Sequence, residues 1–283
     1  MCRISVIIPT YNRAHCLNEA IDSVLSQDFR DYELIVVDDG STDATQDILG
    51  SYDGALRLIC QRHSGVSAAR NRGIAQAAGV FVAFLDSDDL WLPKKLSVQV
   101  DFFRKHPDAL ICQTEEIWIR NGVRVNSKKR HRKYSGDIFE KALPLCIVSP
   151  SAVMMKRSLF DKVGLFDESF SVCEDYDLWL RVSAAYPVHL IETPLIVKRG
   201  GHSDQLSRSF LAIDRFRIKA LCKILTSGSL HRDQERLAID ALEKKCGIYG
   251  RGCLKHGRIK EGRKYLDMPK AFREKSQPHR SKN

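Results

Sequence analysis

Two acidic pairs in this sequence have residue types and spacings suited to chemistry on a phosphorylated substrate. The first is Asp86 and Asp88, with Ser87 between them, directly after the apolar run 81–85. Two carboxylates spaced in this way can present oxygen ligands to Mg²⁺ or Mn²⁺ and leave other coordination positions for phosphate oxygens and water. In an arbitrary sequence such a pair is more often a solvated turn or a helix cap, but its place at the end of an apolar run favours a metal site.

The second pair, Glu174 and Asp175, stands at the start of a stretch with helical periodicity at Leu178 and Val182. Carboxylates at a helix N-terminus have an ordinary explanation, because they interact favourably with the helix dipole. The functional interpretation is a general base that removes a proton from a hydroxyl group. The residue types alone favour the ordinary explanation.

Asp38 and Asp39 follow another apolar run, 34–37, and offer acceptors for the N–H groups of a nucleobase or for ribose hydroxyls. An Asx turn with a helix cap is the alternative, since a Gly-Ser pair comes next. Arg70, in an alanine-rich stretch, could offset the charge of a pyrophosphate, although a single arginine is more often a surface charge.

The elements that must position these residues alternate over the first third of the chain. Short apolar runs predict strands at 5–8, 34–37, 56–59 and 80–85, with helical patterns between them, the last at 67–78. This alternation predicts an α/β domain with a parallel sheet and right-handed crossovers. Ligands bind at the carboxyl ends of such strands. We therefore expect the following residues to converge on one rim: Pro9, Thr10, Tyr11, Asn12, Arg13, Asp38, Asp39, Asp86, Ser87 and Asp88.

The pattern changes after this segment. A helix is expected near 94–105, and Asn121-Gly122 between alternating runs predicts a two-residue hairpin turn. Residues 205–283 have a helical pattern and a basic end with little to bury. An apolar stripe in this part could be a core face or the contact of a homodimer, and it consists of Leu237, Leu242, Cys246, Tyr249 and Cys253.

The composition is that of an ordinary globular protein, with 43% hydrophobic and 28% charged residues among 283. The start does not resemble a signal peptide, no apolar stretch approaches the roughly 20 residues that span a bilayer, and the nine cysteines include no Cys-x-x-Cys pair. We therefore expect a cytoplasmic protein. The net charge of +10 is concentrated in 128–133 and after residue 250, which suits nucleic acid, anionic lipid, a phosphorylated substrate or a solvated surface.

Taken together, these residues resemble the family 2 glycosyltransferases, an inverting family with the GT-A fold. The matching segments are SVIIPTYNR at 5–13, VVDDGSTD at 36–43, SAARNRG at 67–73, FLDSDD at 84–89 with Trp91, then Glu174-Asp175 and His202. Their order and spacing are far more specific than any one of them.

The resemblance implies a Rossmann-like α/β fold, a mostly parallel sheet flanked by helices. The GT-A domain would span 1–207, with a nucleotide-binding half at 1–92 and an acceptor-binding half at 93–207. A helical extension at 208–270 and a basic, disordered tail at 271–283 would follow.

For the sugar donor, the resemblance implies that Asp39 meets the base, that Arg70 helps to hold the nucleotide, and that Asp88 binds a Mn²⁺ or Mg²⁺ ion bridging the diphosphate. Asp86 would lie near both ribose and metal, and His202 near the phosphates, where it could join the metal site. The rest of the nucleotide-sugar site would consist of Pro9, Thr10, Tyr11, Arg13, Asp38 and Ser87.

For the transfer, the resemblance implies that Asp175 is the general base for an acceptor hydroxyl, with Glu174 beside it, while Trp179 and Arg181 shape the acceptor site. A single displacement would invert the anomeric configuration, with the cation stabilising the departing diphosphate. UDP is the commonest carrier in the family. Members often act on lipid-linked saccharides or cell-surface glycans, so peripheral contact with the inner face of a membrane is expected.

Two other function classes stay open. The basic run 128–133 could belong to a nucleic-acid-binding protein, although no recognisable binding module accompanies it and no nucleic acid partner is expected. A non-catalytic scaffold on a nucleotide-binding fold is the second alternative, opposed by the presence of all the candidate catalytic residues.

Overall fold

The first strands form a parallel sheet because their apolar runs have no polar face and must be buried on both sides. In the computed structural model, β1 (Ile4–Thr10) is buried at all seven positions. It pairs in parallel with β2 (Tyr32–Asp38) on one side and with β4 (Phe81–Phe84) on the other. β3 (Arg57–Cys60) continues the parallel sheet beyond β2. The four expected strands are confirmed, each to within two residues of its predicted ends.

Beyond β4 the sheet is mixed. β4 pairs antiparallel with β8 (Val153–Lys156), which pairs antiparallel with β6 (Ile111–Arg120). β6 runs parallel to β9 (His189–Gly200), whose other edge carries the two-residue strand β5 (Leu90–Trp91). The α/β fold is confirmed, and the parallel arrangement is mainly a property of β1 to β4, within residues 1–92.

The hairpin predicted from Asn121 and Gly122 joins β6 to β7 (Val123–Val125). Both turn residues have positive φ, 49° and 77°. A two-residue turn of this kind needs φ > 0 at both positions, which explains the Asn-Gly pair.

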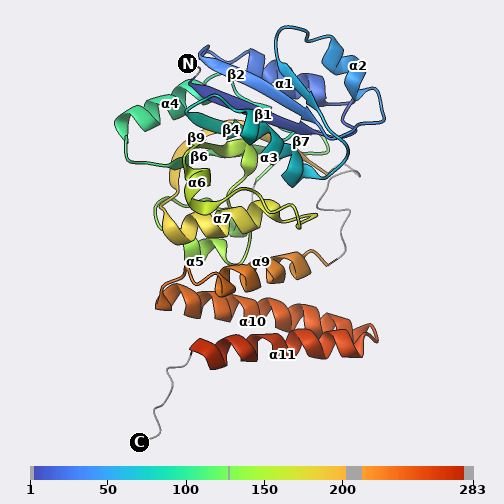
Figure 1. The fold of residues 1–283 in the computed structure, drawn as a ribbon, viewed down its shortest axis with the longest axis vertical. Coiled ribbons are helices and arrows are strands. Elements are labelled where there is room, and N and C mark those ends of the chain that lie inside the picture. Colours follow the sequence, from blue (N-terminus) through green and yellow to red (C-terminus); the bar gives the residue numbers. More distant parts are fainter. Residues whose placement is uncertain (1–2, 127, 202–211, 277–283) are drawn as a thin grey trace, which may run out of the picture.

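Helices cover both faces of the sheet, as Figure 1 shows. Ile7 and Ile8 of β1 point to opposite faces, and each belongs to a separate apolar core. The core around Ile8 includes α1 (Leu17–Leu25) and α4 (Lys95–Lys105), and the core around Ile7 includes α3 (Val66–Gln76). The other helical segments of this part are α2 (Thr45–Gly50), α5 (Phe139–Ala142), α6 (Leu159–Val163), α7 (Glu174–Ala185) and the 3-10 turns Lys129–His131 and Pro150–Ala152.

Three further helices stack below the α/β part in Figure 1. α9 (Asp214–Thr226) packs against α7, α10 (Arg232–Lys255) against α9, and α11 (Ile259–Ser276) against α10. The apolar stripe of α10 faces inward, because Leu242, Cys246 and Cys253 are fully buried within this layer. These positions of the stripe are therefore a core face of the single chain.

The structure describes residues 3–126, 128–201 and 212–276. α11 continues to Ser276, so the prediction of a tail without structure from residue 271 is wrong for 271–276. The remaining residues of that tail and His202 lie outside the described residues.

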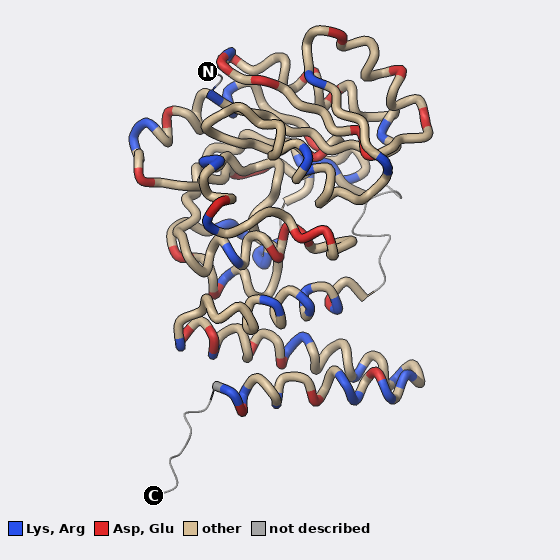
Figure 2. The backbone as a smooth tube through the Cα atoms, viewed as in Figure 1, with Lys and Arg blue, Asp and Glu red and all other residues tan. Residues whose placement is uncertain are grey.

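The basic charge is spread over the surface, with a concentration at the connection between α10 and α11 (Figure 2). The segment 251–264 holds six Lys and Arg residues against one Glu. In the part of the chain that the structure describes, no helix is both long enough and apolar enough to cross a membrane.

Candidate active site

The register of the parallel strands brings the predicted nucleotide-binding residues to one rim. Thr10 pairs with Asp38, and the N–H of Asp39 donates to the carbonyl oxygen of Thr10 at 2.9 Å. Pro9 and Thr10 are buried within β1 and form the floor of the rim. Tyr11, just beyond the strand, is 38% exposed.

Asp38 and Arg13 are held by contacts within the chain. Asp38 is fully buried, and its carboxylate accepts from the N–H of Ser41 (3.0 Å) and the side-chain amide of Gln46 (3.2 Å). The N–H of Arg13 donates to the hydroxyl of Thr45 at 3.0 Å. Asp38 therefore follows the turn-forming alternative and shapes the rim from below.

Asp39, which is 2% exposed, organises the loop after β3. Its Oδ1 accepts from the side-chain amide of Gln61 (2.6 Å) and the N–H of Ser64 (2.9 Å), and its Oδ2 accepts from the N–H of Gly65 (2.8 Å). Nδ1 of His63 lies 2.9 Å from the same Oδ2. A carboxylate offers about four acceptor sites, so this loop already occupies those of Asp39.

The ring of His63 also stacks on Tyr11, with 3.9 Å between centroids and 22° between planes. His63 was not among the residues predicted from the sequence. It lies three residues after β3, and its place in the loop after a predicted strand was the available signal.

Arg70 links the turn after β4 to the start of α7. Its Nη2 donates to Oδ1 of Asp86 at 2.7 Å, and its Nη1 donates to Oε1 of Glu174 at 2.6 Å. The guanidinium is 3% exposed and lies over the ring of Phe166, 5.1 Å from its centroid. Burial lowers the pKa of Arg70, but the charges of Asp86 and Glu174 outweigh this and raise it, so the side chain is a fixed cation.

Glu174 begins α7 and is 5% exposed. Burial raises the pKa of Glu174 to about 7, against the lowering effect of Arg70 and with a further rise from Asp175. Its carboxylate is directed to Arg70, so Glu174 serves as a partner of Arg70 in this geometry.

The turn after β4 carries three acidic residues, Asp86, Asp88 and Asp89, and contacts from other elements hold it in place. The N–H of Asp86 donates to the hydroxyl of Ser151 (3.1 Å), which donates to Asp89 (2.7 Å). Nε of Arg199 donates to the carbonyl oxygen of Asp88 (2.6 Å), and the thiol of Cys16 to that of Ser87 (3.4 Å). Burial, with the nearby charge of Asp88, raises the pKa of Asp89 well above its ordinary value.

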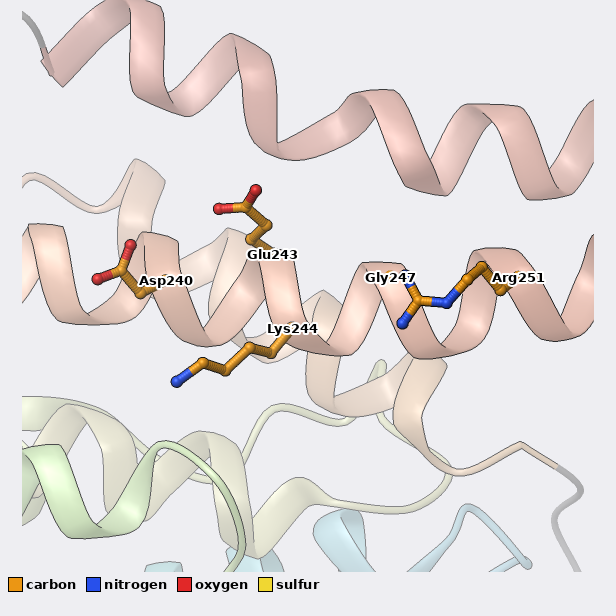
Figure 3. Close-up of a pocket in the computed structure, with 5 residues that line it drawn as sticks. All are labelled: Asp240, Glu243, Lys244, Gly247 and Arg251. Carbon is orange, nitrogen blue, oxygen red and sulfur yellow. The ribbon is translucent and has the colours of Figure 1, made fainter.

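Asp88 borders an open pocket with a volume of about 350 Å³, between the start of α1 and the ends of β6 and β9. Glu19, Asn121 and Arg199 are among the residues that line it. Another hollow, of about 360 Å³, lies on α10 (Figure 3). It is lined by Asp240, Glu243, Lys244, Gly247 and Arg251, and none of the predicted site residues borders it.

Asp175, the predicted base, is half-buried, and the thiol of Cys146 donates to its Oδ2 at 3.3 Å. Burial and the charge of Asp175 raise the pKa of Cys146 well above its ordinary value, so the thiol keeps its proton. The same sulfur lies 3.2 Å from the carbonyl oxygen of Val148. Cys146 is a second residue near the site that the sequence analysis missed.

Lys198 brings a cation to the acidic cluster. Burial lowers its pKa, but Glu116, Asp89 and Asp86 together raise it above the ordinary value. Glu116 also pairs with Lys133 at 3.4 Å, and both side chains are more than nine-tenths buried. The last residue of the basic run 128–133 is therefore a core residue, which the expectation of a solvated or nucleic-acid-binding run did not foresee.

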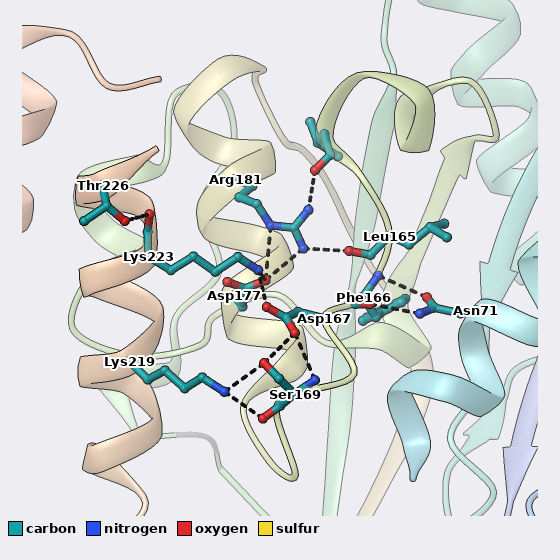
Figure 4. Close-up of polar contacts among 11 residues, drawn as sticks. Asn71, Leu165, Phe166, Asp167, Ser169, Asp177, Arg181, Lys219, Lys223 and Thr226 are labelled. Carbon is teal, nitrogen blue, oxygen red and sulfur yellow. Dashed lines mark hydrogen bonds and ion pairs between the residues drawn. The ribbon is translucent and has the colours of Figure 1, made fainter. Parts of the chain in front are cut away.

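The two residues expected to shape the acceptor site lie elsewhere. Trp179 is 2% exposed and packs edge-on against Phe166, so an acceptor cannot touch it in this geometry. Arg181 is bound to Asp177 at 2.8 Å and to the carbonyl oxygen of Leu165 at 2.8 Å. Figure 4 shows Arg181 and Lys223 of α9 meeting at Asp177, which ties the helical layer to α7. Both predicted acceptor residues are structural here.

A rim of this kind on an α/β sheet fits the chemistry of sugar transfer from nucleotides, and a family comparison decides the matter. A sequence model described as Glycosyl transferase family 2 matches residues 5–164, more than half of the chain. The chain belongs to glycosyltransferase family 2. This glycosyltransferase is 31% identical over 216 residues to the UDP-Glc:alpha-D-GlcNAc-diphosphoundecaprenol beta-1,3-glucosyltransferase WfgD of Escherichia coli, which covers 76% of the chain and 81% of WfgD.

Solved structures agree on the fold. The glycosyltransferase superposes on S. aureus TarS 1–349 in complex with UDP-GlcNAc with a TM-score of 0.71, at 20% identity, over 98% of this chain and 93% of TarS. It also superposes on the mannosyltransferase PcManGT of Pyrobaculum calidifontis in complex with GDP-Man and Mn²⁺, with a TM-score of 0.56, at 19% identity, over 97% of this chain and 85% of that one. The GT-A fold expected from the sequence is confirmed.

The carboxylates after β4 fit a hard divalent cation that shares its coordination with a ligand. Arg70 bonds Oδ1 of Asp86, and Asp88 borders the open pocket. Within 3–126, 128–201 and 212–276, no three His, Cys, Asp or Glu side chains are grouped to hold a metal by themselves. A cation would therefore take its remaining ligands from a diphosphate and water, as Mg²⁺ commonly does.

Proposed function

We propose that this glycosyltransferase moves a sugar from a nucleotide diphosphate, UDP being the favoured carrier, to a hydroxyl group of a lipid-linked saccharide or cell-surface glycan. The observation that carries the proposal is the bridge made by Arg70, which holds the acidic turn after β4 next to the first residues of α7. The sugar donor would then bind on one side of the Arg70 guanidinium, and the acceptor hydroxyl would lose its proton on the other side.

In this proposal Tyr11, Asp39 and the floor at Pro9 and Thr10 bind the nucleoside. Asp86 and Asp88 hold a Mn²⁺ or Mg²⁺ ion, which when bound offsets the charge of the diphosphate. Arg70 holds the carboxylates of Asp86 and Glu174 in place and adds its own positive field. Ser87, Asp38 and Arg13 position the rim through their backbone and turn contacts.

Asp175 is the general base, because its carboxylate is half-buried beside Glu174 and is held by the thiol of Cys146. It would take the proton of the acceptor hydroxyl as that oxygen attacks the anomeric carbon from the side opposite the diphosphate. The product has the inverted configuration. Glu174 supports the base indirectly, through Arg70.

The lipid-linked acceptor is proposed from the relative WfgD, whose name specifies a diphosphoundecaprenol-linked saccharide and a UDP-glucose donor. Peripheral contact with the inner face of a membrane is part of the same proposal, and the basic segment 251–264 would suit an anionic surface. A nucleic-acid-binding function is not proposed, because the family match covers residues 5–164, which include the basic run 128–133.

The experiment is a transfer assay with UDP-sugars, GDP-mannose and dTDP-sugars as donors and GlcNAc-diphospholipid as acceptor, with the product configuration read by NMR. We expect transfer from a UDP-sugar with inversion, and a loss of kcat of roughly 10²- to 10⁴-fold in Asp175→Asn. The matched control Asp161→Asn, on the exposed surface of α6, should behave as wild type. Full activity of Asp175→Asn, or retention of configuration, would contradict the proposal.

A further inference from the structure

Tyr11 and His63 form a stacked pair on the rim, at the place that the proposed function assigns to the nucleobase. An aromatic ring and a base stack with their planes close to van der Waals contact, and His63 lies over Tyr11 at that spacing, 3.9 Å between centroids. A base cannot enter between two rings at this distance, because stacking on both would need roughly twice the separation.

His63 also occupies a hydrogen-bonding position that a base would use. Its Nδ1 lies 2.9 Å from Oδ2 of Asp39 and 3.2 Å from the backbone oxygen of the same residue. The N–H groups of Ser64 and Gly65 take two of the other acceptor positions. The imidazole thus makes both contacts expected of a base, one with the ring of Tyr11 and one with the carboxylate of Asp39.

The backbone around His63 is held in place by its neighbours, whereas its side chain lies at the surface. The N–H of Gln61 donates to the carbonyl oxygen of Asp38 at 3.0 Å. Gly40, with φ at 80°, leaves so little room that an added Cβ would lie 2.8 Å from the backbone nitrogen of His63. By contrast the imidazole is 54% exposed, so it can rotate toward solvent without disturbing the loop.

We infer that His63 acts as a stand-in for the nucleobase, covering Tyr11 and Asp39 until the base of the donor displaces it. The inference rests on the proposed function, since it assumes that a nucleotide binds at this rim. Donor affinity then includes the loss of the stack and of the contact with Asp39. The cost of displacing His63 is the same for every donor, so it lowers the affinity for all nucleotides equally. A base that stacks on Tyr11 and offers an N–H to Asp39, as uracil does, recovers both lost contacts.

The alternative geometry is a sandwich, in which the base lies between Tyr11 and His63. The two arrangements predict opposite effects of removing the imidazole. If His63 is displaced, its removal strengthens nucleotide binding; if it forms half of a sandwich, its removal weakens binding.

The test is calorimetry of UDP binding to the full chain with Mn²⁺ present, for wild type, His63→Ala, His63→Asn and Tyr11→Ala. We expect His63→Ala to bind UDP roughly 3- to 30-fold more tightly, the equivalent of one ring contact and one polar contact. His63→Asn, which keeps a donor for Asp39 but no ring, should gain less, and Tyr11→Ala should bind more weakly than wild type. His256→Ala, at an exposed residue of the α10–α11 connection, is the matched control and should equal wild type.

Equal or weaker UDP binding by His63→Ala, with wild type binding UDP, overturns the inference and leaves the proposed function standing. If neither wild type nor His63→Ala binds UDP, GDP or dTDP, both the inference and the proposed function fail. Binding by His63→Ala where wild type shows none supports the inference in its strongest form.

Discussion

The guanidinium of Arg70 and the carboxylate of Glu174 lie 2.6 Å apart, although 104 positions separate them in the chain. Because Arg70 also bonds Asp86, this contact fixes α7 against the carboxyl end of β4. The relative position of the proposed metal ligands and the proposed base therefore depends on one buried cation.

Replacing this cation should destabilise the protein more than replacing a surface arginine on the same helix. We expect Arg70→Met to lower the free energy of unfolding by about 3 kcal/mol, because it leaves Asp86 and Glu174 without their partner. Denaturant unfolding measures the effect. Arg72→Met, exposed on α3, should change it by less than about 0.5 kcal/mol. Part of the loss should return in the double variant Arg70→Met with Glu174→Gln, and equal stability of Arg70→Met and Arg72→Met would contradict the account.

The thiol of Cys146 should tune Asp175 without being essential for folding. Cys146→Ala removes a hydrogen-bond donor that holds the carboxylate of the proposed base, so kcat should fall about 2- to 10-fold. Cys146→Ser, which keeps a donor of similar size, should restore most of the lost kcat. A kcat of Cys146→Ser no higher than that of Cys146→Ala would contradict a role for the hydrogen bond.

Lys95 should make stability depend on pH. It is fully buried, its Nζ donates to Gln99 at 2.6 Å, and burial lowers the pKa of Lys95 to about 7, whereas the unfolded chain has the ordinary value of 10.5. Between these pH values the unfolded state binds more protons, so the free energy of unfolding rises with pH. Below about pH 7 both states are protonated and this gain is absent.

The variant Lys95→Met removes that contribution. Its free energy of unfolding relative to wild type should fall by about 1 kcal/mol per pH unit between pH 7 and 10. Lys94→Met, at the exposed neighbouring position, is the control and should run parallel to wild type. Parallel curves for Lys95→Met and wild type would show that Lys95 does not titrate in this range.

The sequence predicted what depends on local pattern. Apolar runs located the first strands, and parallel pairing placed Tyr11, Asp39 and Asp86 at one rim. The sequence could not predict β5, because that strand has only two residues. Nor could it predict the pairing of β6 with β9, because this pairing joins segments far apart in the chain.

The environments of individual side chains could not be predicted from the sequence either. The Trp and Arg at 179 and 181 follow the same helical pattern whether they face a ligand or a core, and only packing showed that Trp179 is buried and that Arg181 binds Asp177. Likewise a run of basic residues gives no sign that Lys133 pairs with Glu116 inside the fold. Three-dimensional contacts, and not residue type, decided each role.

The central claim is that donor binding and proton transfer use different carboxylates on the two sides of Arg70. Its most direct test is calorimetry of UDP binding to wild type with Mn²⁺ and with EDTA, then to Asp88→Asn and Asp175→Asn. The account predicts binding that needs Mn²⁺, is lost or weakened at least about tenfold in Asp88→Asn, and is unchanged in Asp175→Asn, whose transfer activity is lost. The account would be contradicted if the affinity for UDP were unchanged both by EDTA and in Asp88→Asn, or if UDP binding were lost in Asp175→Asn.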